Sequence, residues 1–403
     1  MRITAVSTAV IEANFDWTIV RIDTDEGISG LGEAFFSPGL TAIIRELTPL
    51  LIGRRPEHVE RHVRRLQLLT AHGSAGGGVI HHAISGIETA LLDLNAKSLD
   101  IPLWRLLGGK FREKVRVYAD CHAGAPLESY GSVLQARPTP WLQSDEQPSR
   151  GVALEADDFA THARSTVKAG FTTMKFDLDL PREAHEDGWS RRIGSMLVER
   201  QVEIAEAIFD AVGHDAEVAF DLHWSYAAID ALGLARRLEH LPILWLEDPC
   251  PPDNVEALAR VARNTTVPIA TGENQYTRVA FADLITRGGV DVVTPDPQKI
   301  GGLLELRAIA ALADTWALPI APHNISSPIG TVANAHACAS VPNFIALEWH
   351  SSGVPFFDAL VGRADDPVIQ NGHIALSDEP GIGVELDLDV CRRHARAGEP
   401  FFA

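Results

Sequence analysis

Three carboxylates stand at equal intervals along the chain, and each ends a short apolar run. Asp221, Glu247 and Glu273 are separated by 26 residues and again by 26 residues. One strand, one returning helix and two short loops of a parallel α/β fold take roughly that many residues. Carboxylate oxygens are the ligands that Mg²⁺ prefers, and strand ends meet at one rim of a barrel. The spacing therefore predicts a site for one magnesium ion, unless each acid caps the helix that follows it.

The same interval continues beyond the third carboxylate. Asp296, His323 and Glu348 follow the next three apolar runs, at steps of 23, 27 and 25 residues. Asp296 and His323 would lie on adjacent strands, and a carboxylate beside an imidazole fixes its tautomer and supports the imidazolium. The pair is therefore a candidate general base. The alternative is that His323 is a hydrogen-bonded histidine at the barrel rim.

Two strands carry ionisable residues at i and i+2, which places both side chains on one face. They are Lys175 with Asp177, and Asp221 with His223. We expect Lys175 to neutralise a substrate carboxylate or to move a proton; the alternative is an ion pair with Asp177 or Asp120. His223 is suited to protonate a leaving hydroxide, which is too basic to depart unaided; the alternative is a hydrogen-bonded rim residue.

The elements that must position these residues form an α/β, TIM-type (β/α) barrel of seven or eight strands, predicted over residues 115–355. The first strand would end at Asp120-Cys121-His122. Residues 1–114 differ, because a hairpin (Trp17–Asp23 and Ile28–Phe36) precedes three helical segments at Leu40–Leu51, His58–Leu69 and Val79–Ser98. This pattern predicts an α+β capping domain, to which residues 356–403 return.

Composition limits the partners of the chain. Its 403 residues carry a net charge of −19, which argues against nucleic acid as a partner. No apolar run reaches the length of a membrane span, and no signal peptide is evident. The four cysteines are scattered without a zinc or disulfide spacing. We therefore expect a cytoplasmic protein that binds a small molecule, and a homo-oligomer from dimer to octamer.

Two loops could mislead or inform. His72–Gly78 is rich in glycine, but no strand precedes it and no Gly-Lys-Ser/Thr closes it, which argues against a phosphate cradle. Pro126–Ala153 is long and leaves the rim where the site is expected. Loops of that length in a compact domain are usually lids or disordered insertions, and we expect a lid.

Several short motifs occur in one order along almost the whole chain. They are Ala83-Ile84-Ser85-Gly86-Ile87-Glu88, Leu91-Leu92-Asp93, Leu106-Leu107-Gly108-Gly109, Leu246-Glu247-Asp248-Pro249, Gly272-Glu273-Asn274, Pro295-Asp296-Pro297-Gln298-Lys299-Ile300-Gly301-Gly302 and Leu347-Glu348-Trp349. The order resembles the enolase superfamily, and within it the mandelate racemase-like acid-sugar dehydratases. Several motifs in the right order are far more specific than any one of them.

The resemblance implies a shared half-reaction. Magnesium binds a substrate carboxylate, a base removes the α-proton, and the metal stabilises the enediolate. It further implies catalytic roles for His323, Asp296, His223, Lys175 and Glu348. We also expect four residues to contact substrate: Asp177, His122, Asn274 and Trp349.

One departure from the family pattern is informative. The racemases that the chain resembles carry Lys-x-Lys on strand two, whereas this chain has Lys175-Phe176-Asp177. One of the two opposed bases is therefore missing, while His323 is kept. A single strong base favours elimination, and Asp221-Leu222-His223 resembles the Asp-x-His of galactonate-type dehydratases. The resemblance implies an aldonate with R configuration at C2, such as gluconate, galactonate or xylonate.

Two alternatives stay open at this point. A racemase or epimerase could use Lys175 as its second base. A non-catalytic member could keep the same fold and ligands without turnover.

Overall fold

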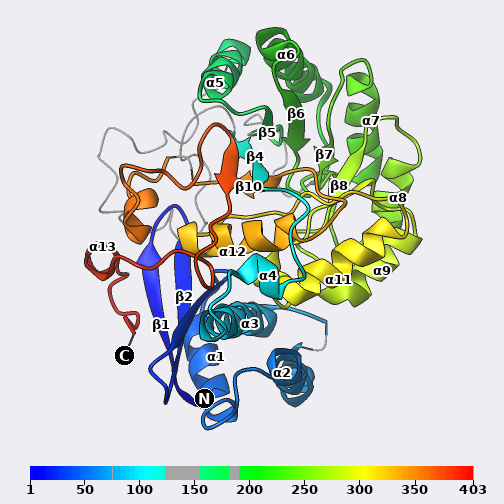
Figure 1. Ribbon diagram of the computed structural model, residues 1–403. Coiled ribbons are helices and arrows are strands. Elements are labelled where there is room, and N and C mark those ends of the chain that lie inside the picture. Colours follow the sequence, from blue (N-terminus) through cyan, green and yellow to red (C-terminus); the bar gives the residue numbers. More distant parts are fainter. Residues whose placement is uncertain (75, 123–154, 181–189, 352, 403) are drawn as a thin grey trace.

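The computed structural model describes residues 1–403 except 75, 123–154, 181–189, 352 and 403. The predicted lid at Pro126–Ala153 lies outside the described residues. An N-terminal α+β part lies beside a barrel of strands and helices, as Figure 1 shows. None of the described helices is long and apolar enough to cross a membrane.

The barrel is built of parallel strands that pair in chain order. Its first strand pairs with the second and with the last, so the sheet returns on itself. The seventh position, predicted at Leu318–Ala321, is reduced to Ile320, which bridges Val293 on one side and Phe344 on the other. The strands are β4 (Lys114–Asp120), β5 (Thr173–Asp177), β6 (Glu217–Asp221), β7 (Leu246–Glu247), β8 (Ile269–Thr271), β9 (Val292–Val293) and β10 (Leu347–Trp349).

A separate apolar layer fills the middle of the barrel. Tyr118 and Trp245 are its two large members, with ring centroids 5.4 Å apart in an edge-to-face arrangement. The remaining buried members are small: Ala219, Ala270, Val292, Ala321 and Ala346. Large rings opposite small side chains fill a narrow barrel without a void. The layer forms the floor beneath the strand ends.

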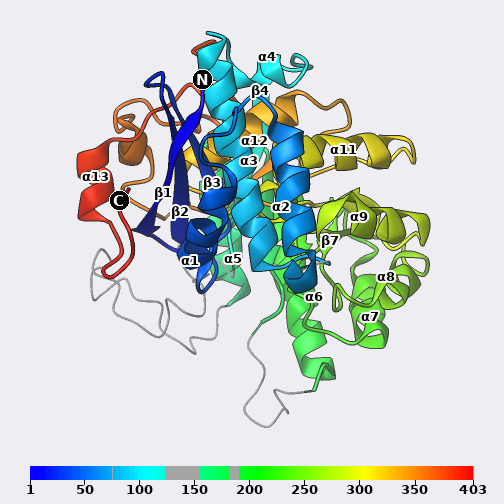
Figure 2. The same cartoon turned by 90° about the horizontal axis from the view of Figure 1, so that it is seen from below.

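The helices alternate with the strands, as the sequence predicts. A capping box begins the first of them, because Glu155 and Asp158 each bond the other's backbone N–H. The barrel helices are α5 (Ala156–Lys168), α6 (Ser195–Val212), α7 (Ala228–Leu238), α8 (Val255–Ala262), α9 (Thr277–Thr286), α10 (Pro297–Ile300), α11 (Leu303–Asp314) and α12 (Pro328–Ala339). Figure 2 shows α7, α8 and α9 on the side of the barrel away from the N-terminal sheet.

The N-terminal part is a three-stranded antiparallel sheet covered by helices. β2 (Asp16–Thr24) and β3 (Ser29–Ala34) confirm the predicted hairpin, whereas β1 (Ile3–Glu12) was not predicted. The helices are α1 (Leu40–Leu47), α2 (Val59–Ser74), α3 (Val79–Ser98) and α4 (Leu103–Leu106). The loop expected from His72 begins later, because α2 continues to Ser74.

Close packing of α3 on the sheet depends on two glycines of β3. A Cβ atom at Gly30 would lie 2.1 Å from the Ala90 carbonyl oxygen, and one at Gly32 would lie 2.3 Å from that of Gly86. No side chain fits at either position, so the helix backbone lies directly on the strand. This approach brings Glu88 of α3 within reach of the barrel.

Two buried carboxylates join the N-terminal part to the barrel, each at the start of a barrel helix. Glu88 accepts the backbone N–H groups of Leu303 and Leu304, both at 2.9 Å, where α11 begins. Glu33 accepts those of Ser327 (3.0 Å) and Gly330 (3.1 Å), where α12 begins. Helix N-termini favour such acceptors. Burial nevertheless raises the pKa of each carboxyl to about 7.

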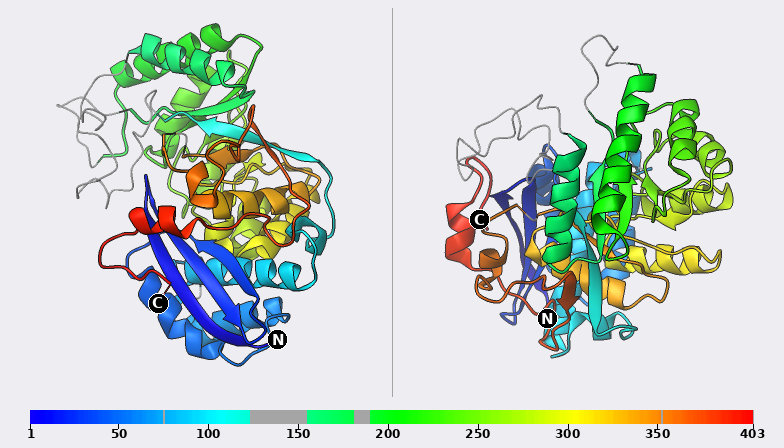
Figure 3. Two further views of the ribbon diagram at one scale, coloured as in Figure 1. Left: turned by 60° about the vertical axis from the view of Figure 1, so that its left-hand side comes forward. Right: turned by 90° about the horizontal axis from the view of Figure 1, so that it is seen from above.

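The C-terminal segment returns to the N-terminal sheet. After β10, the chain forms η3 (Asp358–Val361), β11 (His373–Ala375), which pairs with β4, and α13 (Leu388–Arg393). Backbone N–H groups of Arg396 and Phe402 then donate to Val10 and Thr8 of β1, at 2.9 and 2.7 Å. Figure 3 shows α13 beside this sheet. The exact domain bounds stay a prediction.

Candidate active site

Three carboxylates converge at the strand ends. Asp221 ends β6, Glu247 ends β7, and Glu273 lies two residues beyond β8. One oxygen from each lies within 4.8 Å of the others, and all three side chains are buried. Glu247 Oε1 has no hydrogen-bond partner among the described residues. Buried, closely spaced oxygens with spare lone pairs fit a hard divalent cation such as Mg²⁺.

Lys175 of β5 lies among these acids. Its ammonium is 2.9 Å from Asp221 Oδ2, 3.3 Å from Glu247 Oε2 and 2.8 Å from Glu348 Oε1. Burial disfavours the charge, but Glu247, Glu348 and Asp221 raise the pKa of Lys175 well above its ordinary value. The sequence left open an ion pair of Lys175 with Asp177 or Asp120, but its described ion pairs are with Asp221, Glu247 and Glu348. Three carboxylates therefore hold the Lys175 ammonium in place.

His323 is paired with Asp296 below the mouth of the barrel. Its Nδ1 is 2.7 Å from Asp296 Oδ2, while its Nε2 is 3.3 Å from Glu273 Oε2 and 3.8 Å from Glu348 Oε2. Asp296 Oδ1 accepts the Gln298 N–H at 2.7 Å as the N-cap of α10, so its carboxylate is fixed from two sides. Burial opposes protonation, yet Glu273 and Glu348 raise the pKa of His323 to about 10.

The segment after His323 is held by the N-terminal part. Trp17 Nε1 donates to the Ile325 carbonyl at 3.2 Å, and Glu33 binds the start of α12. Within the barrel, the Asn324 N–H donates to Glu348 Oε2 at 3.0 Å. The imidazole is therefore positioned by both parts of the chain.

His223 lies on the other side of the carboxylates. Its Nδ1 is 3.0 Å from Asp179 Oδ1, and its Nε2 is 3.9 Å from Asp221 Oδ2. The side chain is 34% exposed and its backbone φ is +39°. Burial opposes protonation, but Asp221, Asp177 and Asp179 together raise the pKa of His223 well above its ordinary value. It is therefore suited to donate a proton.

Sequence reasoning missed Asp179 as the partner of His223. The signal was present, because Asp179 continues the i, i+2 series of Lys175 and Asp177 beyond the strand end. Asp177 itself is partly buried near these groups, and desolvation raises its pKa to about 8.

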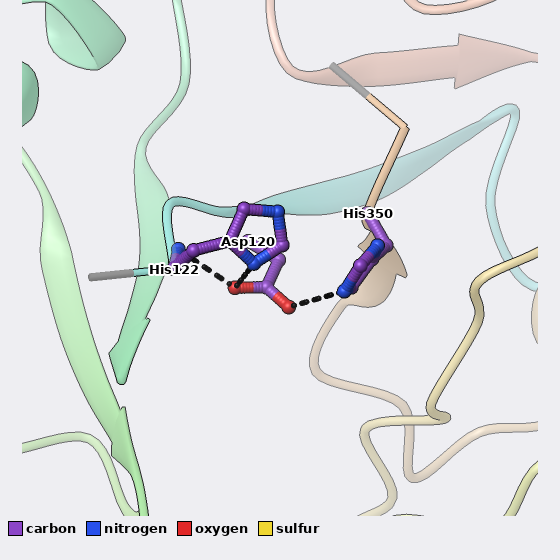
Figure 4. Close-up of side chains that lie close together, drawn as sticks. All are labelled: Asp120, His122 and His350. Carbon is purple, nitrogen blue, oxygen red and sulfur yellow. Dashed lines mark hydrogen bonds and ion pairs between the residues drawn. The ribbon is translucent and has the colours of Figure 1, made fainter. Parts of the chain in front are cut away.

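The other residues expected at the substrate lie in different places. Asn274 donates to Glu273 Oε1 at 3.0 Å and accepts from Lys299 Nζ at 2.8 Å. His122 lies beside Asp120 (Figure 4), on the β4 side of the mouth. Trp349 stacks on Phe171, with ring centroids 5.7 Å apart. Neighbouring strand residues face opposite sides, so Glu348 points inward and Trp349 points away from the carboxylates.

Known proteins share this arrangement of domains. Residues 3–108 match the model of the mandelate racemase/muconate lactonizing enzyme N-terminal domain, and residues 158–390 match the enolase C-terminal domain-like family. A D-xylonate dehydratase of Haloferax volcanii is 40% identical over 99% of this chain and 90% of its own length. A D-galactonate dehydratase of Variovorax paradoxus is 29% identical, over 96% and 92% of the two chains.

Solved structures agree with these matches. A mandelate racemase/muconate lactonizing enzyme-like protein of Rubrobacter xylanophilus superposes with a TM-score of 0.90 at 39% identity, covering 100% of this chain and 99% of the other. A mandelate racemase/muconate lactonizing enzyme of Sulfitobacter superposes with a TM-score of 0.84 at 27% identity, covering 99% and 97%. With its capping part, its barrel and its carboxylates at successive strand ends, the chain belongs to the mandelate racemase/muconate lactonizing enzyme family of the enolase superfamily.

Proposed function

We propose that the protein is a magnesium-dependent hydro-lyase that dehydrates an acid sugar, an aldonate with R configuration at C2, to a 2-keto-3-deoxy acid. The observation that carries the proposal is the placement of two different acid–imidazole pairs around one carboxylate cluster. His323 with Asp296 lies on one side, and His223 with Asp179 on the other. The names of the relatives, D-xylonate and D-galactonate dehydratases, support the same substrate class.

Asp221, Glu247 and Glu273 would hold the cation. When bound, a divalent ion supplies positive charge that offsets the negative charge developing on the substrate carboxylate. Lys175 would orient that carboxylate, and Glu348 would hold the Lys175 ammonium in place at 2.8 Å beside the cluster. The buried surroundings exclude water and strengthen these interactions.

His323 would remove the C2 proton. A cation held by Glu273 would offset the negative charge that raises the pKa of this imidazole, and the neutral ring could then accept a proton. Asp296 accepts from Nδ1–H, so Nε2 is the nitrogen that faces the mouth and receives the proton. Lys175 is engaged by three carboxylates and leaves the opposite face without a second base. The family resemblance connects a base on the His323 face with the R configuration at C2.

His223 would complete the elimination. It donates a proton to the C3 hydroxyl as the C3–O bond breaks, and water leaves. The electron pair from the C2–H bond forms the C2–C3 double bond, and the resulting enol becomes the 2-keto-3-deoxy acid. Asp179 holds the His223 ring and stabilises its charged form.

A panel of aldonates and aldarates, assayed with magnesium for 2-keto-3-deoxy acids, tests the proposal. We expect product from one or more aldonates with R configuration at C2. Deuterium incorporation at C2 of recovered substrate without any keto acid would support a racemase or epimerase instead. The absence of product, of exchange and of binding would support a non-catalytic protein. Cytoplasmic location and assembly into a dimer to octamer stay predictions, which fractionation of cells and mass measurement in solution test.

A further inference from the structure

A second group of polar side chains lies at the mouth, separate from the three carboxylates. It consists of Asp120, His122 and His350, which we term the β4–β10 cluster (Figure 4). Asp120 ends β4, and His350 follows β10, which pairs with β4. Asp120 is also the register partner of Lys175 on β5. The cluster therefore borders the site on the side opposite β7 and β8.

Its members are buried yet loosely spaced. Asp120, His122 and His350 are 4%, 2% and 6% exposed. The His122 ring is 3.3 Å from Asp120 Oδ1, and His350 Nε2 is 3.5 Å from Asp120 Oδ2. These separations exceed the usual length of a charge-assisted hydrogen bond, in contrast to the 2.7 Å contact of His323 with Asp296. Asp120 Oδ1 also accepts the His122 backbone N–H at 3.1 Å, so the spare hydrogen-bonding capacity lies at Asp120 Oδ2 and His350 Nε2.

Asn14, in the turn between β1 and β2, determines which ring nitrogen of His350 carries the proton. Its Nδ2 lies 3.0 Å from His350 Nδ1 and donates to the His350 carbonyl at 3.2 Å. The opposite amide orientation would place Oδ1 against that carbonyl oxygen, so the NH₂ group faces both atoms. His350 Nδ1 is therefore an acceptor, and in the neutral ring Nε2 carries the proton. The ring stays neutral because burial, with His122, lowers the pKa of His350 well below its ordinary value.

The result is an N–H donor beside a carboxylate acceptor. His350 Nε2–H and Asp120 Oδ2 face each other, and a hydroxyl group can accept from the first while donating to the second. A metal ion would need a free lone pair on His350 Nε2. Because Nδ1 accepts from Asn14, the ring proton of neutral His350 is on Nε2, and that lone pair is not free. The chemistry therefore favours hydroxyl groups over a cation.

We propose that the β4–β10 cluster binds the hydroxyl groups of the substrate's far end, beyond C3, and so selects long polyhydroxy acids over short hydroxy acids. The inference rests on the proposed acid-sugar dehydratase function and adds which residues recognise the chain beyond the reacting carbons. Asp120 and His350 contact the hydroxyls. Asn14 is a positioning residue, through which the N-terminal part fixes the His350 ring.

The test compares two ligands that share a carboxylate, a C2 hydroxyl and a C3 hydroxyl. D-xylonate has further hydroxyls, whereas D-glycerate has none. In His350→Phe, which keeps a ring but loses both nitrogens, we expect xylonate affinity to fall about 10- to 100-fold, the effect of one or two lost hydrogen bonds. Glycerate affinity should change less than about threefold, because carboxylate recognition is untouched. Calorimetric titration with magnesium present measures both, with His323→Asn added to every protein so that xylonate is bound but not dehydrated.

Three companion variants keep the test decisive. Asp120→Asn should repeat the selective loss, and Asn14→Leu should show it in weaker form, in KM more than in kcat. Cys121→Ser is the matched control, since Cys121 lies between Asp120 and His122 in sequence but contacts Thr166. Its affinity for both ligands should stay that of the unaltered protein. These variants decide the question if His350→Phe does not fold.

Two outcomes would overturn the inference. One is an equal loss of affinity for xylonate and glycerate, or no loss of affinity for either, in the folded variants. The other is binding of Co²⁺, in excess magnesium, with visible absorption bands that disappear in His350→Phe, because it would assign the cluster to a metal. Failure of the proposed function looks different: the unaltered protein would then form no keto acid from any aldonate, while the two affinities could still be compared.

Discussion

The two histidines at the mouth of the barrel differ in how they are held. His323 is nearly fully buried, contacts Asp296 at 2.7 Å, and precedes a segment bound by Trp17 and Glu33 of the N-terminal part. His223 is one-third exposed, and its described ring contacts are with Asp179, Asp221 and Trp224, all within the barrel. One imidazole is enclosed by both parts of the chain, and the other is partly exposed to solvent.

This difference matches two chemical tasks. A base that takes a weakly acidic C–H proton needs a fixed geometry and little competing water. An acid that protonates a leaving hydroxide must be recharged in every cycle, so contact with solvent is useful. The difference supports the proposed division, in which His323 takes the C2 proton and His223 protonates the C3 hydroxyl. The predictions below test that division, from the largest expected effect to the smallest.

Removing the cation should stop both the C2 exchange that depends on His323 and the elimination that depends on His223. The negative charge that forms after C2 deprotonation would then lack its main stabilisation, so neither exchange nor elimination can proceed. We expect chelation to lower both C2 exchange and keto-acid formation by about 10³-fold or more, and magnesium to restore both. Glu247→Gln, which removes one anionic ligand, should act in the same direction. Full activity after chelation would contradict the assigned cation site.

Removing the enclosed imidazole should also stop both reactions, but with the cation still bound. His323→Asn should reduce C2 exchange and product formation by about 10²- to 10⁴-fold, the usual contribution of a general base. Mass spectrometry of substrate recovered from D₂O measures the exchange. If exchange persisted in His323→Asn and vanished in Lys175→Ala, Lys175 would be the base and the expected C2 configuration would be reversed.

Removing the open imidazole should separate the two reactions. His223→Asn should lower product formation by about 10²-fold or more while C2 exchange stays measurable, because His323 is unaltered. Asp179→Asn should give a smaller loss of the same kind. It should also lower the apparent pKa of the alkaline limb of the pH–rate profile, where His223 loses its proton, since a partner that stabilises charged His223 is gone. Equal loss of exchange and elimination in His223→Asn would argue against separate roles.

The sequence was informative about the spacing of Asp221, Glu247 and Glu273, because a repeating strand–helix unit converts equal intervals into one rim. It did not reveal the partners that lie off this repeat. Asp179 follows the strand end, and Asn14 comes from a distant turn, so only the folded chain brings them to His223 and His350. Trp349 was expected at the substrate because it follows Glu348 in sequence. Neighbouring residues of a strand face opposite sides, and Trp349 stacks on Phe171.

The hold of the N-terminal part on the His323 side should weaken as pH rises. Burial raises the pKa of Glu33 from 4.5 to about 7, so the folded protein binds this proton more tightly than the unfolded chain. Between pH 4.5 and about 7, rising pH ionises Glu33 in the unfolded chain but not in the folded protein, which lowers the free energy of unfolding. Above about pH 7 Glu33 is ionised in both states, and the free energy of unfolding falls no further on its account. Relative to Glu33→Gln, the unaltered protein should lose about 2 kcal/mol of unfolding free energy between pH 5.5 and 8.

Thermal or urea unfolding of both proteins at the two pH values measures this difference. Glu113→Gln is a suitable control, because Glu113 is 80% exposed and pairs with Lys110 at the surface, so its removal should leave the pH dependence unchanged. Ionised Glu33 keeps its hydrogen bonds to Ser327 and Gly330, so the expected effect on C2 exchange is small. Any effect of Glu33 ionisation should lower C2 exchange, which depends on His323, more than it lowers proton donation by His223. An identical pH dependence in Glu33→Gln and the unaltered protein would show that Glu33 is ionised throughout, and that the N-terminal part holds the His323 side equally at both pH values.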